Sequence, residues 1–226
     1  MQKEWRRPIV LVYIIRHGQS YNTHPLPGVP DPVNPPLTPI GLEEVRRLAG
    51  RLATLEPSRL VASPMLRTVE TARILGRETG LPVEVRPGIH EFREIEGYVC
   101  WGGRELTATY PDLVISPDLG AESWVYGNES RKSAVRRADA LLAWLRGEAS
   151  ARPSARIAIV SHGAMTQIVL GRVLHAGFDE MERVVIDNTA VSTLLFSASG
   201  TAVLGINDTS HLVGVDGLDP LSGITR

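Results

Sequence analysis

Residues 8–18 read PIVLVYIIRHG, a run of apolar and mostly β-branched residues that ends in Arg16, His17 and Gly18. A short, continuous apolar run of this kind is typical of a strand that is buried on both faces of a parallel sheet. The polar residues follow at the carboxyl end of the predicted strand, which is where open α/β sheets bind their ligands. The stretch therefore indicates an α/β sheet and makes Arg16 and His17 candidate site residues.

The same pattern recurs twice downstream. Residues 156–163 read RIAIVSHG and residues 59–64 read RLVASP, so two further apolar runs end in His162 and in Ser63. A glycine or a proline follows the terminal polar residue of each run. If the three strands are parallel, their carboxyl ends share one edge of the sheet, and we expect His17, Ser63 and His162 to converge there.

Two arginines belong to the same predicted edge. Arg16 directly precedes His17, and Arg67 falls in the first turn of the helix predicted after Ser63. A basic residue in a first turn is unfavourable for the helix dipole, so Arg67 is either a surface residue with a small cost or a residue with an anion beside it. Two imidazoles and two guanidinium groups at one edge favour a multiply charged anion, most plausibly a phosphoryl group.

The composition is that of a globular chain without a strong overall charge. The 226 residues are 43% hydrophobic and carry a formal net charge of −1, which argues against nucleic acid or an anionic membrane as a partner. Cys100 is the only cysteine, so no internal disulfide can form and a cytoplasmic location is expected. The apolar run after Arg6 and Arg7 is interpreted as a strand and not as an export signal, and no stretch is long enough to span a bilayer.

Helical patterns alternate with the predicted strands. Thr38 is a predicted N-cap with Pro39 at the first helical position, and apolar residues recur at a spacing of three to four up to about Leu55. The charged residues of this helix, Glu44 among them, are predicted to face water. Further helices are predicted over residues 64–79, 129–149 and 164–174, and further strands over residues 83–85, 184–186, 191–197 and 202–206.

This alternation predicts a three-layer α/β/α sandwich with a mostly parallel central sheet, as a single domain over residues 1–226. Residues 92–128 are rich in tryptophan and tyrosine and are predicted to form a small covering subdomain over the sheet edge. Its rings form a minor core of their own, or one or two of them line a leaving-group pocket. Residues 212–226 lack periodicity and are predicted to be a surface tail.

Residues 88–97 read GIHEFREIEG and combine one histidine with three carboxylates. His90 and Glu91 match the first half of a zinc-binding helix motif, but Glu94 stands where the second histidine would be. We therefore expect no metal and no cofactor. A metal-dependent hydrolase is kept as an alternative with three candidate ligands: His17, His90 and His162. The other histidines are assigned to structure or to the surface: His24, His175 and His211.

The order and spacing of the motifs resemble those of the histidine phosphatase superfamily, which has the phosphoglycerate mutase-like fold. The resemblance spans nearly the whole chain, and six motifs carry it: Arg16-His17-Gly18, Leu37-Thr38-x-x-Gly41, Ser63-Pro64-x-x-Arg67-x-x-x-Thr71-Ala72, Ile89-His90-Glu91, Ser161-His162-Gly163 and Asn207-Asp208-Thr209-x-His211-Leu212. Each motif alone is weak, but their occurrence in this order is a strong signal.

The resemblance implies a metal-independent phosphatase that acts on a small-molecule phosphomonoester. His17 would attack phosphorus as a neutral imidazole and form a phosphohistidine. Glu91 would protonate the leaving oxygen and then deprotonate the incoming water, with Glu94 as the alternative acid. Nearby guanidinium groups should disfavour the charged form of His17.

The resemblance also implies the residues that bind the phosphoryl oxygens. They are Arg16, Arg67 and His162, together with Asn22. The family usually has an asparagine six residues after the nucleophile, and this chain has Thr23 at that position, so Asn22 stands one residue early.

Other functions stay open at this point. A phosphoglycerate mutase-type phosphotransferase shares the phosphohistidine step, but no Arg-Arg pair of the kind that mutases use occurs between Glu91 and Glu129, which favours the phosphatase. A non-catalytic phosphate-binding protein is the alternative from another class. A homo-oligomer is also left open.

Overall fold

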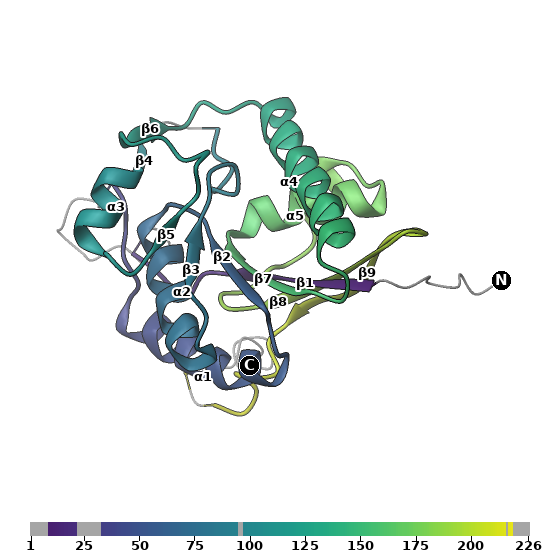
Figure 1. Ribbon diagram of the computed structural model, residues 1–226, viewed down its shortest axis with the longest axis horizontal. Helices are drawn as coiled ribbons and strands as arrows, with labels where there is room; N and C mark the ends of the chain where they lie inside the picture. Colours follow the sequence, from purple (N-terminus) through teal and green to yellow (C-terminus); the bar gives the residue numbers. More distant parts are fainter. Residues whose placement is uncertain (1–8, 22–32, 95–96, 216, 219–226) are drawn as a thin grey trace.

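The computed structural model describes residues 9–21, 33–94, 97–215 and 217–218. Within these residues, seven strands form one central sheet in the order β5-β3-β2-β7-β1-β8-β9 (Figure 1). The first five run parallel to one another, whereas β8 and β9 are antiparallel additions at one edge. The strands are β1 (Ile9–Arg16), β2 (Arg59–Ala62), β3 (Val83–Val85), β5 (Val114–Ile115), β7 (Arg156–Ser161), β8 (Val191–Ser197) and β9 (Gly200–Asp208).

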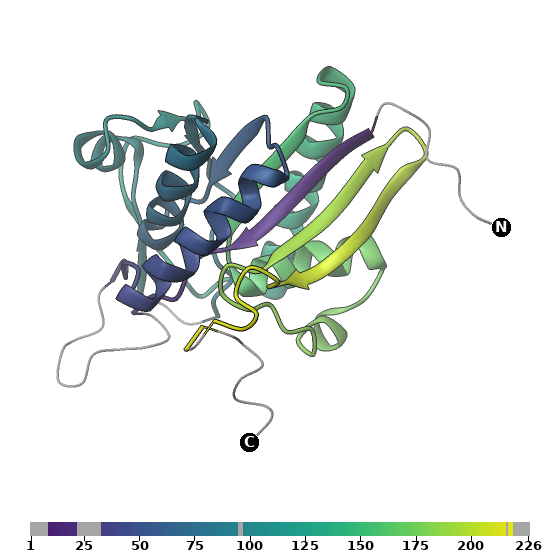
Figure 2. The same cartoon turned by 90° about the horizontal axis from the view of Figure 1, so that it is seen from below.

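The three strands with polar ends are neighbours in the sheet. β1 pairs with β7 so that Arg16 lies opposite Ser161, and β2 pairs with β7 so that Ala62 lies opposite Val160. Their carboxyl ends are therefore level, as the sequence predicted. Figure 2 shows the hairpin of β8 and β9 running alongside β1 on its other side.

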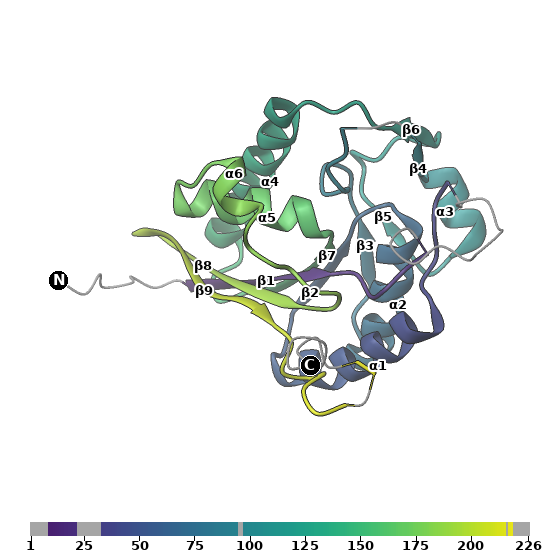
Figure 3. The same ribbon diagram turned by 180° about the vertical axis from the view of Figure 1, so that it is seen from behind.

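Helices cover both faces of the sheet, which confirms the three-layer α/β/α sandwich. One face carries α1 (Pro39–Thr54) and α2 (Leu66–Thr79), and the other carries α4 (Arg131–Ala151), α5 (Gly163–Leu174) and the short α6 (Phe178–Met181) (Figure 3). Each face has its own apolar core: residues such as Leu48 pack on the first, and residues such as Leu142 on the second. Thr38 is the N-cap of α1, because its Oγ1 accepts a hydrogen bond from Gly41 N at 3.0 Å.

The aromatic segment after Glu91 contains a two-stranded antiparallel sheet of β4 (Tyr98–Cys100) and β6 (Trp124–Tyr126), with α3 (Gly103–Thr109) between them. Cys100 and Tyr126 form a small buried cluster with Met65, which precedes α2. The same segment also contributes β5 to the central sheet, which the sequence did not predict, because a two-residue strand carries no periodicity.

Four expectations were wrong in detail. Residues 184–186 are not a strand but an irregular link between α6 and β8. The helix predicted from Pro64 begins at Leu66, with Met65 as its N-cap. Glu44 faces inward and is 6% exposed, and Leu212, the first residue of the predicted surface tail, is 2% exposed.

None of the helices in the described ranges combines the length and the apolar character needed to cross a membrane.

Candidate active site

His17 and His162 come together where β1 and β7 end. Their ring centroids are 5.2 Å apart with an interplanar angle of 64°. His17 N donates to Ser161 O at 3.0 Å, which fixes the end of β1 against the residue before His162. Both side chains are at most 1% exposed. The structure therefore brings the two histidines to one place, as the parallel-strand argument predicted.

The hydrogen bonds of His17 define its tautomer. Nδ1 lies 2.7 Å from Gly18 O, and Nε2 accepts from Arg67 Nε at 3.0 Å. A carbonyl oxygen can only accept and a guanidinium can only donate, so the proton resides on Nδ1 and the lone pair on Nε2. Burial holds the pKa of His17 well below its usual range, and the charges of Arg67 and Arg16 lower it further.

Arg67 is a fully buried cation in the first turn of α2, at 0% exposure. Besides the bond of its Nε to His17, its Nη2 makes a weak contact with Met65 Sδ at 3.4 Å. Its Nη1 is buried and has no hydrogen-bond partner among the described residues. A buried guanidinium with a spare donor favours an anion beside it.

Arg16 lies at the same edge, next to the amino terminus of α5. Its Nη1 donates to Ile186 O at 2.6 Å, and a Cβ atom placed on Gly163 would lie 3.5 Å from its Nε. That Nε is also buried without a partner among the residues described. Burial lowers the pKa of Arg16, and the charges of Glu91 and Asp187 act in the opposite direction.

His162 is held by the third strand end. Its Nε2 lies 2.9 Å from Ser63 Oγ, and its Nδ1 is buried with no hydrogen-bond partner in the described part of the chain. Burial holds the pKa of His162 well below its usual range, with Arg67 as the next contribution. Burial therefore favours the neutral form of the ring, and Nδ1 is left for a ligand among the described residues.

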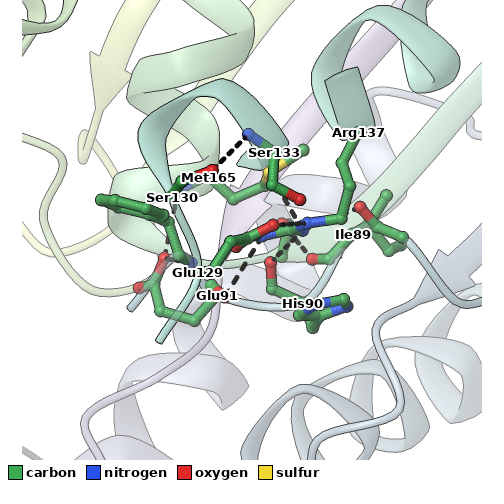
Figure 4. A network of polar contacts seen from close by, with 11 residues as sticks. Ile89, His90, Glu91, Glu129, Ser130, Ser133, Arg137 and Met165 are labelled. Carbon is green, nitrogen blue, oxygen red and sulfur yellow. Dashed lines mark hydrogen bonds and ion pairs between the residues drawn. The ribbon is translucent and has the colours of Figure 1, made fainter. Parts of the chain in front are cut away.

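Glu91 lies in the segment that precedes β4 and interacts electrostatically with Arg16. Figure 4 shows the contacts of Glu91 with its neighbours. Its Oε1 accepts from its neighbour Phe92 N at 2.9 Å and from Met165 N, in the first turn of α5, at 3.1 Å. The carboxylate thus lies at the amino terminus of the helix that begins after His162. The alternative acid Glu94 is exposed and pairs with Arg131 at 3.4 Å.

Of three further candidates, the structure describes only His90. Asn22 and His24 lie outside the described residues. The ring of His90 packs edge-on against Tyr126 at 5.2 Å, and burial lowers its pKa to about 3. Within the described ranges, no group of three or more histidine, cysteine, aspartate or glutamate side chains is arranged to hold a metal ion.

The loop after His17 is packed tightly against α1, and this explains the glycine in the motif at residues 37–41. A Cβ atom on Gly41 would lie 2.0 Å from Gln19 O, and one on Gly18 would lie 2.7 Å from Gly41 O. Only glycine permits this approach. The buried Glu44 completes the contact, because its Oε2 accepts from Gln19 N at 2.7 Å.

Sequence reasoning assigned no role in the site to three side chains that organise it. Glu44 follows Gly41 by three residues, so it shares the inner face of α1, and this spacing was the available signal. Thr71 accepts from Gly18 N at 3.2 Å and lies one turn after Arg67. Arg137 contacts the Glu91 segment from α4, and no local pattern identifies it.

Comparisons with known proteins identify the family of this chain and its structural relatives. A sequence model of the family described as "Histidine phosphatase superfamily (branch 1)" matches residues 12–209. The "Probable phosphoglycerate mutase GpmB" of Enterobacter sp. (strain 638) is 26% identical over 219 residues, which cover 89% of this chain and 94% of that protein.

Among solved structures, a mutant phosphoserine phosphatase from Entamoeba histolytica in complex with phosphoserine has a TM-score of 0.65 at 21% identity, and the match covers 90% of this chain and all of that one (100%). The α-ribazole phosphatase from Shigella flexneri has a TM-score of 0.64 at 20% identity, over 88% of this chain and 96% of the other. These likenesses show a shared fold.

Proposed function

Because this chain belongs to the histidine phosphatase superfamily, we propose that it is a phosphatase that hydrolyses phosphomonoesters through a phosphohistidine on His17. The observation that carries the proposal is the state of His17: a buried, neutral ring whose Nε2 lone pair points at Arg67. A neutral imidazole is a nucleophile, whereas an imidazolium is not.

In the first step, Nε2 of His17 attacks phosphorus while the bond between phosphorus and the ester oxygen breaks. Glu91 gives its proton to the departing oxygen, so that an alcohol leaves. The spare donors of Arg16 and Arg67 and the free nitrogen of His162 are proposed to bind the three equatorial oxygens, where negative charge gathers in the transition state.

In the second step, water attacks phosphorus and the bond between phosphorus and nitrogen breaks. Glu91, now a carboxylate, accepts the proton from the water, which regenerates the enzyme and releases inorganic phosphate. We assign this role to Glu91 and not to Glu94, because Glu91 interacts electrostatically with Arg16 whereas Glu94 pairs with the exposed Arg131.

The leaving group is proposed to carry an anionic group of its own. The guanidinium of Arg93 lies 4.1 Å from the centroid of the Tyr98 ring, and Arg67 lies 5.5 Å from the same centroid. Arg93 Nε is buried with no hydrogen-bond partner among the described residues. Because Arg93 and Arg67 both contact the Tyr98 ring, we propose that the charge of Arg93 lies beside the phosphoryl site and faces the leaving group. Phosphoserine, the ligand of the Entamoeba structure, is a phosphomonoester whose leaving group carries a carboxylate.

The proposal is tested by phosphate release from sugar phosphates, phosphoglycerates, nucleotides and phosphopeptides, with and without a chelator. Inorganic phosphate released at the same rate under both conditions supports a metal-independent phosphatase. Isomer formation from 3-phosphoglycerate without phosphate release would instead support the mutase named among the relatives. Release that is lost with the chelator would support the metal-dependent alternative.

Matched substrates test the anionic leaving group. Phosphoserine and phosphoethanolamine differ by one carboxylate, as do 3-phosphoglycerate and glycerol 3-phosphate. We expect the carboxylated member of each pair to have the higher kcat/KM, and Arg93→Met to remove that preference. Equal kcat/KM within both pairs would overturn this assignment without touching the phosphatase proposal.

A further inference from the structure

A largely buried ion pair of Arg137 and Glu129 contacts the Glu91 segment. Arg137 comes from the second turn of α4, and Glu129 lies two residues before that helix begins. Arg137 Nε donates to Glu129 Oε1 at 2.8 Å, and Arg137 Nη2 donates to Glu129 Oε2 (Figure 4). Their side chains are only 14% and 11% exposed. The bidentate geometry fixes the orientation of the guanidinium.

The other donors of Arg137 hold the backbone that carries Glu91. Nη1 donates to Gly88 O at 2.9 Å and to His90 O at 2.8 Å, and Nη2 donates to Glu91 O at 3.4 Å. Glu129 adds a further bond, because its backbone N donates to Arg93 O at 3.1 Å. The pair therefore binds four backbone carbonyls within six residues of chain.

This segment has little structure of its own. Residues 86–94 contain no helix and no strand, so their carbonyls have no partners in regular secondary structure. In addition to the bonds from Arg137 and Glu129, Ser161 Oγ donates a hydrogen bond to Ile89 O at 2.8 Å. A guanidinium with five donors in a rigid fork can replace the missing backbone ladder.

Arg137 also supports the carboxylate end of Glu91. Its Nη1 lies 3.5 Å from Met165 Sδ, and Met165 N is the donor to Glu91 Oε1 at 3.1 Å. The backbone of Glu91 and the residue that holds its side chain thus share contacts with one guanidinium, as Figure 4 shows.

We propose that Arg137, oriented by Glu129, is a positioning residue that sets the place of the Glu91 carboxyl group relative to the leaving oxygen. This rests on the proposed role of Glu91 as acid and base. Arg137 acts through Glu91 and has no role in binding the phosphoryl group. Its removal should therefore impair the steps that need proton transfer and leave the attack by His17 intact.

The test compares Arg137→Gln with Glu91→Gln on two kinds of ester. p-Nitrophenyl phosphate has a good leaving group that needs little protonation, whereas an alkyl phosphate cannot leave without it. The quantity measured is kcat/KM, which covers the steps up to departure of the leaving group. Arg137→Lys keeps the charge but cannot form the fork, so it should restore only part of the lost rate.

Two variants serve as matched controls. Arg136→Gln removes an exposed arginine from the adjacent position of α4. Arg59→Gln breaks another half-buried ion-pair cluster, with Glu84 and Glu148, near the opposite end of the sheet. The melting temperatures of all variants show whether a lower rate comes from reduced stability or from a displaced Glu91 carboxyl group. Neither control should change the ratio of the two kcat/KM values.

We expect Arg137→Gln to lower kcat/KM for the alkyl phosphate by about 10²-fold, as a misplacement near 1 Å does, and for p-nitrophenyl phosphate by less than about threefold. In the double variant with Glu91→Gln, Arg137→Gln should cause almost no further loss, because both changes remove the same proton transfer. Equal losses on both esters, or independent losses in the double variant, would overturn the inference. If Glu91→Gln itself spared the alkyl phosphate, the acid role in the proposed function would fail instead.

Discussion

Arg67 Nε donates a hydrogen bond to His17 Nε2 at a distance of 3.0 Å, and both residues are at most 1% exposed to solvent. The arginine thus occupies the lone pair that is proposed to attack phosphorus. A phosphoryl group that enters the site must displace this bond, and the freed N–H then lies next to an oxygen of the incoming group. Arg67 therefore adds to burial in lowering the pKa of His17 before binding, and it stabilises negative charge on the phosphoryl group after binding.

From this relationship we predict that Arg67→Gln lowers kcat/KM by about 10²- to 10³-fold, to a similar extent for esters with good and poor leaving groups. The reason is that Arg67 contacts the transferring group, which all substrates share. The pKa of His17, followed by NMR, should also rise, because a neighbouring positive charge is lost. Arg77→Gln, an exposed change in the last turn of α2, is the control. An unchanged His17 titration in Arg67→Gln would contradict this account.

For Glu91→Gln we predict a loss that depends on the leaving group. Alkyl phosphates should lose about 10²- to 10⁴-fold in kcat/KM, which is the usual worth of general acid catalysis, and p-nitrophenyl phosphate should lose much less. Glu94→Gln is the matched control, since Glu94 is exposed and paired with Arg131. A larger loss from Glu94→Gln than from Glu91→Gln would exchange the two assignments.

The buried histidines make folding stability dependent on pH. Burial lowers the pKa of His17, of His162 and of His90, the last to about 3, while the unfolded chain titrates near 6.5. Below pH 6.5 the unfolded chain binds protons that these buried histidines do not bind in the folded chain. Their contribution to the free energy of unfolding is therefore fully present above pH 6.5 and is lost as the pH falls.

We expect His17→Asn to lose less stability than the wild type between pH 7 and pH 5, because the lowered pKa of His17 makes the wild type less stable as the pH falls. Urea denaturation at each pH measures this difference. His175→Asn is the control, because His175 is exposed and holds a left-handed C-cap that asparagine tolerates. Parallel stability curves for His17→Asn and the wild type would show that folding does not shift the pKa of His17, which would contradict this account.

A pair of glycines in α1 tests the packing beneath the nucleophile. Gly41→Ala places a Cβ atom 2.0 Å from Gln19 O, so the loop after His17 must move, and we expect a loss of about 1–3 kcal/mol together with much of the activity. Gly50→Ala on the same helix meets nothing within 4 Å and should stabilise by about 1 kcal/mol without changing activity. Thermal unfolding measures the stability of each variant, and phosphate release measures its activity. Wild-type activity in Gly41→Ala would show that this contact does not position the loop.

The sequence predicted the parts of the site that depend on the sheet. Strands buried on both faces have a strong local signal, and parallel pairing then places His17, Ser63 and His162 together without further information. The N-cap at Thr38 was also predictable, because it depends on neighbouring residues only.

Features that depend on long-range contacts were not predictable in this way. Glu44 was predicted to be exposed, but the loop at Gln19 supplies a backbone donor that makes its burial favourable. Residues 184–186 are apolar enough for a strand, yet Ile186 O accepts a hydrogen bond from Arg16 and not from a neighbouring strand. Arg137 has no local pattern, since its partners lie on segments that meet only in the folded chain.

The most direct test of the central claim is mass spectrometry of the enzyme after rapid quenching at alkaline pH, during turnover of a phosphomonoester. We predict a phosphoryl group on the peptide that contains His17 in the wild type, with greater accumulation when dephosphorylation is slowed in Glu91→Gln, and none in His17→Asn. A phosphoryl group on another residue, or phosphate release that persists in His17→Asn, would contradict the account.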